Sequence, residues 1–271
     1  MNLEMRFPGG KNKTVTFSYD DGRIFDKRLS DIFSSHGLKA TFNINSNNFN
    51  NSDGKSYITW EDAKKYYLDA GHEVAVHTLT HPWLEGLRTT DTLFEIIEDR
   101  KEIEKHLGVI SRGMAYPYGC YNDQTLDAIR LSGIEYSRTV VSTHNFFMPK
   151  NWLTLDATCH HNDPQLFELA ERFLQPAKWG NCQMFYVWGH SYEFDNNDNW
   201  DVIEKFADII SGKDYIWYAT NIEIFDYVKA FENLRTSFDN SIVYNPSAVT
   251  VWFSLGGKIY SVKGGETIKI A

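Results

Sequence analysis

The alternation of short strands with helical stretches predicts an α/β fold built on parallel strands. Apolar runs rich in Val, Ile, Phe, Tyr and Thr recur along most of the chain, with helical patterns between them. Most helical patterns end at a glycine, which is typical of a left-handed C-cap. Strands joined by crossover helices pair in parallel, and about seven to eight of them predict a distorted (β/α) barrel. An open doubly wound sheet is the alternative, although no G-x-G-x-x-G motif follows the first strand.

Each element follows from a local pattern. Strands are expected at residues 14–19, 39–44, 73–77, 113–116, 134–140, 153–158, 184–188 and 215–219. Helices are expected at residues 26–36, 61–70, 91–107, 123–132, 200–211 and 221–234. One further helix is expected to open at Asp163-Pro164, a cap followed by a proline at the first position. Asn122 is the expected N-cap of the helix at 123–132.

The sequence changes character from residue 239 onward. Two Gly-Gly pairs separate runs of alternating residues there, which predicts a small antiparallel meander. A sheet this small is not stable alone, so we expect it to pack on the barrel. The predicted domains are therefore a barrel at residues 1–238 and a C-terminal β extension at residues 239–271.

The composition is that of a globular protein with an acidic balance. The 271 residues include 27 Lys and Arg against 36 Asp and Glu, a formal net charge of −9. This charge argues against nucleic acid or an anionic membrane as a partner, but it leaves sugars and small amides open. The three cysteines form no C-x-x-C pair, which argues against a thiolate zinc site. No apolar stretch could span a membrane and no signal-peptide pattern is seen, so we expect a cytoplasmic protein, with a trimmed leader as the alternative.

Two adjacent carboxylates, Asp20 and Asp21, close the first expected strand and precede Gly22. Asp-Gly is common turn chemistry, so a plain turn is one interpretation. Two carboxylates at a buried strand end also repel each other. A bound cation would relieve this repulsion, with one carboxylate as its ligand and the other left as a base.

Histidines follow two further expected strands. His77 and His81 are four residues apart and would share one face if the segment coiled into a helical turn. Two imidazoles and one carboxylate form a three-ligand set with open positions, which suits a catalytic metal. His190 ends a third apolar run, where a lone histidine is more often a core residue. Because the C-terminal strand ends of a barrel meet at one face, we expect these residues to converge there.

Taken in order, these motifs resemble those of the polysaccharide deacetylases of carbohydrate esterase family four, which have the NodB-homology fold. The family motifs Thr-Phe-Asp-Asp-Gly, His-(Ser/Thr)-x-x-His, Arg-x-Pro-Tyr-Gly and Leu-x-His correspond to residues 18–22, 77–81, 115–119 and 188–190. The resemblance covers residues 13–234 and leaves the tail outside it.

The resemblance implies a role for each matching residue. The ligands of one divalent metal ion would be Asp21, His77 and His81. Zinc is the most common metal in this family, and cobalt, nickel or iron also suits such a ligand set. Asp20 would be the general base for a metal-activated water, and His190 the general acid that protonates the leaving amine. The backbone N–H of Tyr118 would help to hold the oxyanion.

Ser18-Tyr19 in place of Thr-Phe is a mild departure from the family motifs, and two further departures matter more. Ala115 replaces the arginine that holds the catalytic base, and Arg138 in the next expected strand is the candidate replacement. Trp188 replaces a leucine that lines the acetyl pocket, which puts the acyl group in question. Asp156 is a candidate partner that would orient His190 or Arg138.

Other polar and aromatic residues have two interpretations each. His160 and His161 would face the same cleft or form a surface loop. Trp83, Trp152 and Trp188 would stack on sugar rings or belong to the core.

We therefore expect a metal-dependent hydrolase that removes an acyl group, acetyl if the family substrate holds, from an N-acetylated amino sugar or oligosaccharide. The alternatives are a hydrolase of a small linear or cyclic amide on the same fold and a non-catalytic carbohydrate-binding protein. The expected partner is a small molecule or an oligosaccharide, and neither nucleic acid nor a membrane.

Overall fold

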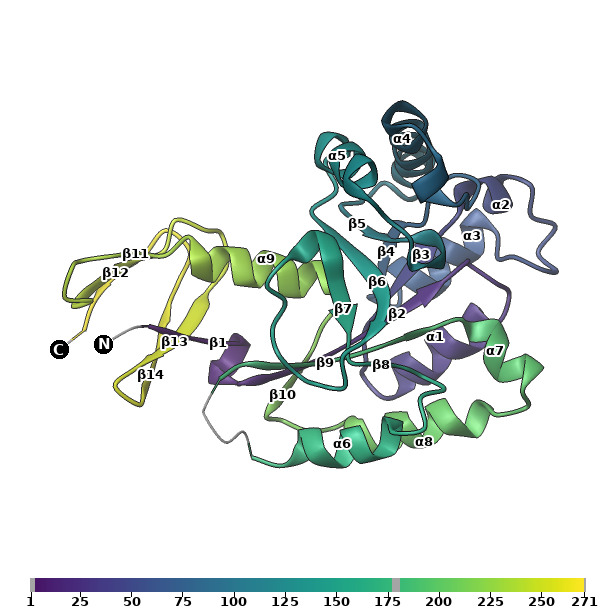
Figure 1. Ribbon diagram of the computed structural model, residues 1–271. Helices are drawn as coiled ribbons and strands as arrows, with labels where there is room; N and C mark the ends of the chain where they lie inside the picture. The colour runs from purple at the N-terminus through teal and green to yellow at the C-terminus, as the bar shows by residue number, and fades with distance from the viewer. Residues whose placement is uncertain (1–2, 177–180, 271) are drawn as a thin grey trace.

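A parallel sheet of nine strands organises the chain, whose computed structural model describes residues 3–176 and 181–270 (Figure 1). The strands are β2 (Lys13–Asp20), β3 (Ala40–Ile44), β4 (Glu73–Val76), β5 (Gly113–Ala115), β6 (Tyr136–Ser142), β7 (Leu155–Ala157), β8 (Cys159–His160), β9 (Gln183–Gly189) and β10 (Ile216–Tyr218). Their order is β7-β6-β5-β4-β3-β2-β9-β8, and β10 pairs with the first half of β2. All eight strands expected for this sheet are therefore present, and β8, of two residues, is the one described strand of this sheet that was not expected.

The two ends of this sheet are joined by a single residue. β7 pairs with β6 and β8 pairs with β9, while Thr158 alone separates β7 from β8. The Thr158 N–H donates to the carbonyl of Tyr186 on β9, at 2.8 Å. The sheet therefore curls back on itself as a distorted barrel, as predicted, rather than as an open doubly wound sheet.

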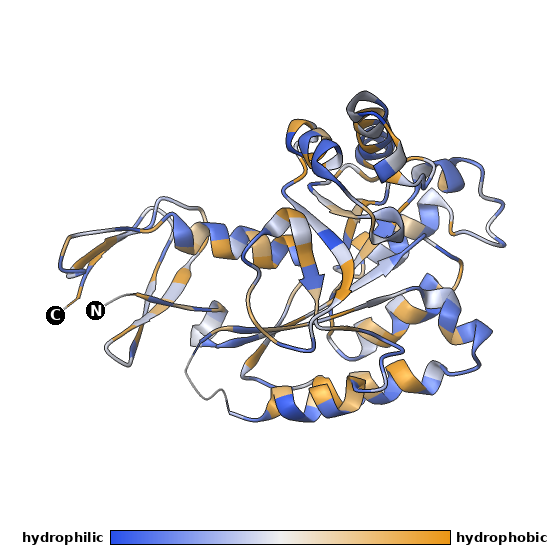
Figure 2. Cartoon of the chain, viewed as in Figure 1, coloured by the Kyte–Doolittle hydropathy of each residue, from blue (hydrophilic) through white to orange (hydrophobic). Residues whose placement is uncertain are grey.

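Helices cover the outside of the barrel and carry one apolar side each. They are α1 (Asp26–Ser35), α2 (Ser46–Asn50), α3 (Trp60–Ala63), α4 (Thr89–Leu107), α5 (Asp123–Ser132), α6 (Leu166–Leu174), α7 (Ser191–Asn196), α8 (Trp200–Ile210) and α9 (Asn221–Glu232). In Figure 2, α6 and α8 show hydrophobic and hydrophilic segments along the same helix. Their apolar residues, such as Phe173 and Phe206, pack in one core cluster with Phe17 and Phe185 of the sheet.

Most of the expected helices are confirmed, with two corrections. Asn122 caps α5 as predicted, because its side chain accepts the Thr125 N–H. The segment at 61–70 divides into α3 and a π-helical turn, Lys64–Leu68. The helix predicted to open at Asp163-Pro164 begins at Leu166 instead. Asp163 is held away from the cap position, because it accepts the Gln165 N–H and pairs with His144.

The C-terminal strands form two small antiparallel sheets beside α9 (Figure 1). The strands are β1 (Glu4–Arg6), β11 (Arg235–Thr236), β12 (Ile242–Tyr244), β13 (Val251–Leu255), β14 (Lys258–Val262) and β15 (Thr267–Lys269). A separate core joins Ala230 of α9 to Val243, Val251 and Phe253. The N-terminal β1 pairs with β13, so residues from both ends of the chain build one sheet. The domain boundary at residue 238 stays a prediction.

No helix in the described part of the chain has the length and apolar character needed to cross a membrane.

Candidate active site

A cavity of about 760 Å³ opens where the strands of the barrel end. Its lining brings together most of the residues singled out from the sequence. These are Asp20, Asp21, His77, His81, Tyr118, Trp188 and His190. They follow or end β2, β4 and β9, apart from Tyr118, which lies in the turn after β5. The predicted convergence at one face of the barrel is therefore seen in the fold.

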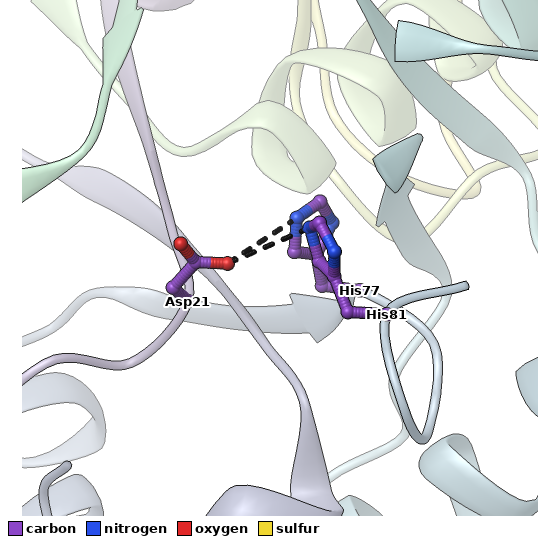
Figure 3. A group of neighbouring side chains, drawn as sticks. All are labelled: Asp21, His77 and His81. Atoms are coloured by element: carbon purple, nitrogen blue, oxygen red, sulfur yellow. Dashed lines mark ion pairs between the residues drawn. The ribbon is translucent and has the colours of Figure 1, made fainter. Parts of the chain in front are cut away.

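Asp21, His77 and His81 point toward one another at this face (Figure 3). The Nε2 atoms of both histidines lie 3.7 Å from Oδ1 of Asp21. Tetrahedral ligands at 2.0–2.2 Å from a metal lie about 3.4 Å apart. Three donor atoms at this spacing fit a single divalent cation.

The tautomer of His77 also fits a metal ligand. Its Nδ1 lies 2.8 Å from the carbonyl oxygen of Ala115, so Nδ1 carries the proton and donates. Nε2 is then left with a free lone pair on the side that faces Asp21. The backbone N–H of His77 donates to Asp99, which also accepts the N–H of Ser46 and fixes the end of β4.

The segment that carries the two histidines is not a helical turn, which corrects the sequence-based expectation. Thr78 and His81 have φ angles of 68° and 59°, in the left-handed region that non-glycine residues avoid. Asp21 and Tyr118 at the same cavity have φ angles of 79° and 57°. Non-glycine residues in this region cost of order 1–3 kcal/mol each and cluster at functional sites. The strained turns, rather than helical periodicity, bring the rings of His77 and His81 to a centroid distance of 4.8 Å.

Asp20 lies beside the metal-type cluster in a buried hydrogen-bond network. The guanidinium of Arg138 donates to its Oδ2, and the Asn43 amide donates to Oδ1 at 2.8 Å. Burial favours the neutral acid, but Arg138, with His77 and His190, lowers the pKa of Asp20 below its ordinary value. Arg138 is fully buried and its guanidinium lies 4.4 Å from the Trp188 ring centre. Arg138, from the next strand β6, thus contacts Asp20 in place of the arginine that is missing at position 115.

His190 also lies close to Asp20. Its Nε2 is 4.0 Å from Oδ2 of Asp20, and its Nδ1 is 3.4 Å from Oε1 of Glu193. Burial lowers the pKa of His190, but Glu193, Asp20 and Asp21 together raise it above its ordinary value. Glu193 was not predicted as a site residue from the sequence. Its signal was its place three residues after His190, where an acidic side chain closes a capping box at the start of α7.

Glu193 also gathers two other histidines. The Nε2 atoms of His160 and His161 lie 3.1 and 3.0 Å from its Oε2. Nδ1 of His160 accepts the Asn162 N–H, so in the neutral ring the proton sits on Nε2 and faces Glu193. This nitrogen therefore has no free lone pair for a metal, and the cluster is a carboxylate cage in which three histidines lie within ion-pair distance of Glu193. Gly189 allows it, because a Cβ there would lie 2.0 Å from Nδ1 of His161.

Two exposed aromatic rings lie beside the cavity, where Tyr118 belongs to the lining and Trp83 packs on Tyr118. Trp83 and Tyr118 stack with ring centroids 5.3 Å apart, and Tyr118 meets the His81 ring edge-on. Both rings are more than half exposed, so Trp83 is not a core residue. Trp152 is buried, in a cluster with Leu155.

Asp156 lies outside this group. It accepts a hydrogen bond from Thr139 at 2.5 Å and lines a different cavity with Asn145 and Phe147. Neighbouring side chains of a strand point to opposite faces. Leu155 and Ala157, which flank Asp156, share the core cluster of Trp188, so Asp156 faces away from it.

Comparison with known proteins gives a consistent picture. Residues 8–137 match the family model described as polysaccharide deacetylase. The chain is 29% identical over 128 residues to a peptidoglycan-N-acetylglucosamine deacetylase of Listeria monocytogenes, covering 46% of this chain and 26% of that protein. It is 31% identical over 118 residues to a chitin deacetylase of Arthroderma benhamiae, covering 41% and 29%. The chain thus spans less than a third of the length of these relatives.

The fold is shared with solved structures. The peptidoglycan deacetylase PdaC of Bacillus subtilis superposes with a TM-score of 0.53 at 18% identity, covering 82% of this chain and 94% of that chain. At this identity, the likeness concerns the fold alone.

Proposed function

Because residues 8–137 make the chain a member of the polysaccharide deacetylase family, we propose that it is a metal-dependent hydrolase acting on the N-acyl amide of an N-acetylated amino sugar or oligosaccharide. The observation that carries this proposal is one cavity lined by a buried carboxylate, an imidazole and a three-residue cluster of metal-ligand type. The relatives, which are described as deacetylases of peptidoglycan and chitin, support the sugar substrate.

Asp21, His77 and His81 would hold the divalent cation, for which zinc is our first choice, with cobalt, nickel and iron as alternatives. When bound, such a cation polarises the acyl carbonyl and makes water a stronger nucleophile near neutral pH.

Asp20 is the proposed general base. It would take a proton from the water that attacks the carbonyl carbon. Each carboxylate oxygen has two acceptor sites, so the bonds from Asn43 and Arg138 leave room for this proton. The same two bonds keep Asp20 fixed in one orientation, which favours proton transfer in a defined direction.

His190 is the proposed general acid. It would donate a proton to the amide nitrogen as the carbon–nitrogen bond breaks, so that a free amine and a carboxylic acid leave the site. Glu193 would fix the imidazole from its Nδ1 side and stabilise its charged form. The backbone N–H of Tyr118 remains our proposed donor to the oxyanion.

The stacked rings of Trp83 and Tyr118 are a proposed platform for a sugar ring next to the scissile amide. Trp188 occupies the place of a smaller family residue, and we propose that it restricts the acyl group to a short one.

The test combines metal content with turnover. Protein purified without an affinity metal should bind one divalent ion per chain and release acetate from N-acetylglucosamine oligomers. Asp20→Asn should keep the metal but lose turnover by about 10²–10⁴-fold. Asp156→Asn, the same chemical change outside the cavity, is the matched control. Sugar binding without release of acid from sugars or small amides would instead favour a binding protein. Turnover of small amides but not of sugars would favour the alternative of a hydrolase of small linear or cyclic amides.

A further inference from the structure

Arg23 follows Gly22 directly and contacts two residues of the cavity lining. Its guanidinium carbon is 4.6 Å from the ring centre of Tyr57 and 5.5 Å from that of Tyr192. Both tyrosines line the cavity. The backbones of Arg23 and Tyr57 also pair through an isolated β-bridge. The guanidinium therefore packs against two tyrosines that line the cavity, in a partly buried position.

The charge of Arg23 has no protein counterion in the described part of the chain. Arg6 and Arg28, the nearest arginines on either side in the sequence, each pair with a glutamate. Arg138, deeper in the same site, pairs with Asp20. No described carboxylate lies within 4.0 Å of Arg23, and its Nε is buried without a hydrogen-bond partner. A guanidinium without an acceptor is destabilising in a partly buried position, so this position favours a ligand that supplies an acceptor to the rest of the group.

We propose that Arg23 binds an oxyanion group of the substrate, and hence that the preferred substrate is an amino-sugar chain carrying a carboxylate or a phosphate. A guanidinium offers a planar fork of N–H donors that matches either group, with two parallel hydrogen bonds. The inference rests on the proposed deacetylase function and adds a preference for acidic over neutral chains. It assigns Arg23 to binding of a substituent and not to the chemistry of the amide.

The two tyrosines make the arrangement specific. Ring faces attract a guanidinium without consuming its N–H donors, which stay available in the plane of the group. Tyr192 follows His190 by two residues, so a group bound at Arg23 would sit near the proposed acid. The Trp83–Tyr118 platform lies beside His81. The cavity is large enough for one sugar chain to contact this platform and Arg23 together.

The experiment compares three N-acetylglucosamine oligomers of equal length, which are neutral, carboxylate-bearing and phosphate-bearing. For the wild-type enzyme, kcat/KM should be highest for one of the charged chains, and the better one identifies the anion. In Arg23→Gln, the ratio of kcat/KM for that chain to kcat/KM for the neutral chain should fall by about 10- to 100-fold. Arg23→Lys keeps the charge but loses the planar fork of donors, so its ratio of kcat/KM should lie between those of wild type and Arg23→Gln. Arg235→Gln, an exposed arginine of β11, is the matched control and should leave the ratio unchanged.

A binding measurement separates failure of this inference from failure of the proposed function. Calorimetric titration with the deacetylated forms of the same chains needs no turnover. Tighter binding of a charged chain by wild type, lost in Arg23→Gln, supports the inference even if no acetate is released. Equal binding and equal kcat/KM for all three chains would overturn it. Arg23 would then be a link between Tyr57 and Tyr192, and Arg23→Gln would lower the melting temperature without changing substrate preference.

Discussion

The buried pair of Asp20 and Arg138 makes a strong prediction about stability. The two side chains are 3% and 0% exposed, so solvent screening does not weaken their interaction. Removing one member of a buried pair leaves the other charge unpaired, which typically costs about 3–5 kcal/mol. Asp20→Asn and Arg138→Gln should therefore each lower the free energy of unfolding by about that amount.

The double variant distinguishes this reasoning from simple loss of packing. With both charges gone, Asn43 still has an amide acceptor in place of Asp20, and no unpaired ion is buried. Its free energy of unfolding should lie close to that of the single variants, not about 6–10 kcal/mol below wild type.

Urea denaturation of chelator-treated protein measures all four free energies without a metal contribution. Two single effects that add in the double variant would refute the view that Arg138 replaces the missing motif arginine as the partner of Asp20.

Three further predictions concern the metal cluster, the His190 cage and a buried acid. His77→Ala should lose the metal measured by elemental analysis, whereas His36→Ala, on the helical surface, should retain it. Glu193→Gln should lower the pKa of His190, because the Glu193 carboxylate stabilises the charged imidazole, and the fall of kcat at high pH should therefore move to lower pH. Burial raises the pKa of Asp26 from 3.8 to about 7, so ionisation opposes folding as pH rises through that range. The difference in free energy of unfolding between Asp26→Asn and wild type should shift by up to about 4 kcal/mol toward the variant between pH 4 and pH 8.

Each of these has a clear contrary result. Full metal content in His77→Ala would remove it from the ligand set. An unchanged pH profile in Glu193→Gln would make the cage structural only. A difference between Asp26→Asn and wild type that stays constant with pH would show that Asp26 does not titrate in this range.

The sequence predicted the face of the barrel where the site lies, because parallel strands end together and each motif followed a strand. It did not predict how the backbone turns there. The left-handed residues Thr78 and His81 depend on tertiary contacts, which no residue spacing shows. The sequence also did not show which side chains of the short strand β7 face the site, and Asp156 was wrongly expected to face it.

The tertiary structure also brings residues to the site from segments outside the predicted motifs. Arg138 meets Asp20 because β6 and β2 curve toward each other, although three strands of the sheet, β3, β4 and β5, lie between them. Glu193 was missed because the short helix α7 was not expected, and its three histidine partners come from two separate segments. Curvature and short helices arise from packing, which a single sequence does not reveal.

The pairing of β1 with β13 has a consequence for how the chain folds. Its register joins residues 4–6 to residues 252–254, so this sheet closes a loop that contains the whole barrel. The entropy of closing a loop grows with its length, and contacts this distant in sequence form slowly. During synthesis, β1 has no partner until residues 252–254 have left the ribosome. We therefore expect the strands of the barrel, whose partners are closer in sequence, to pair before β1 joins β13.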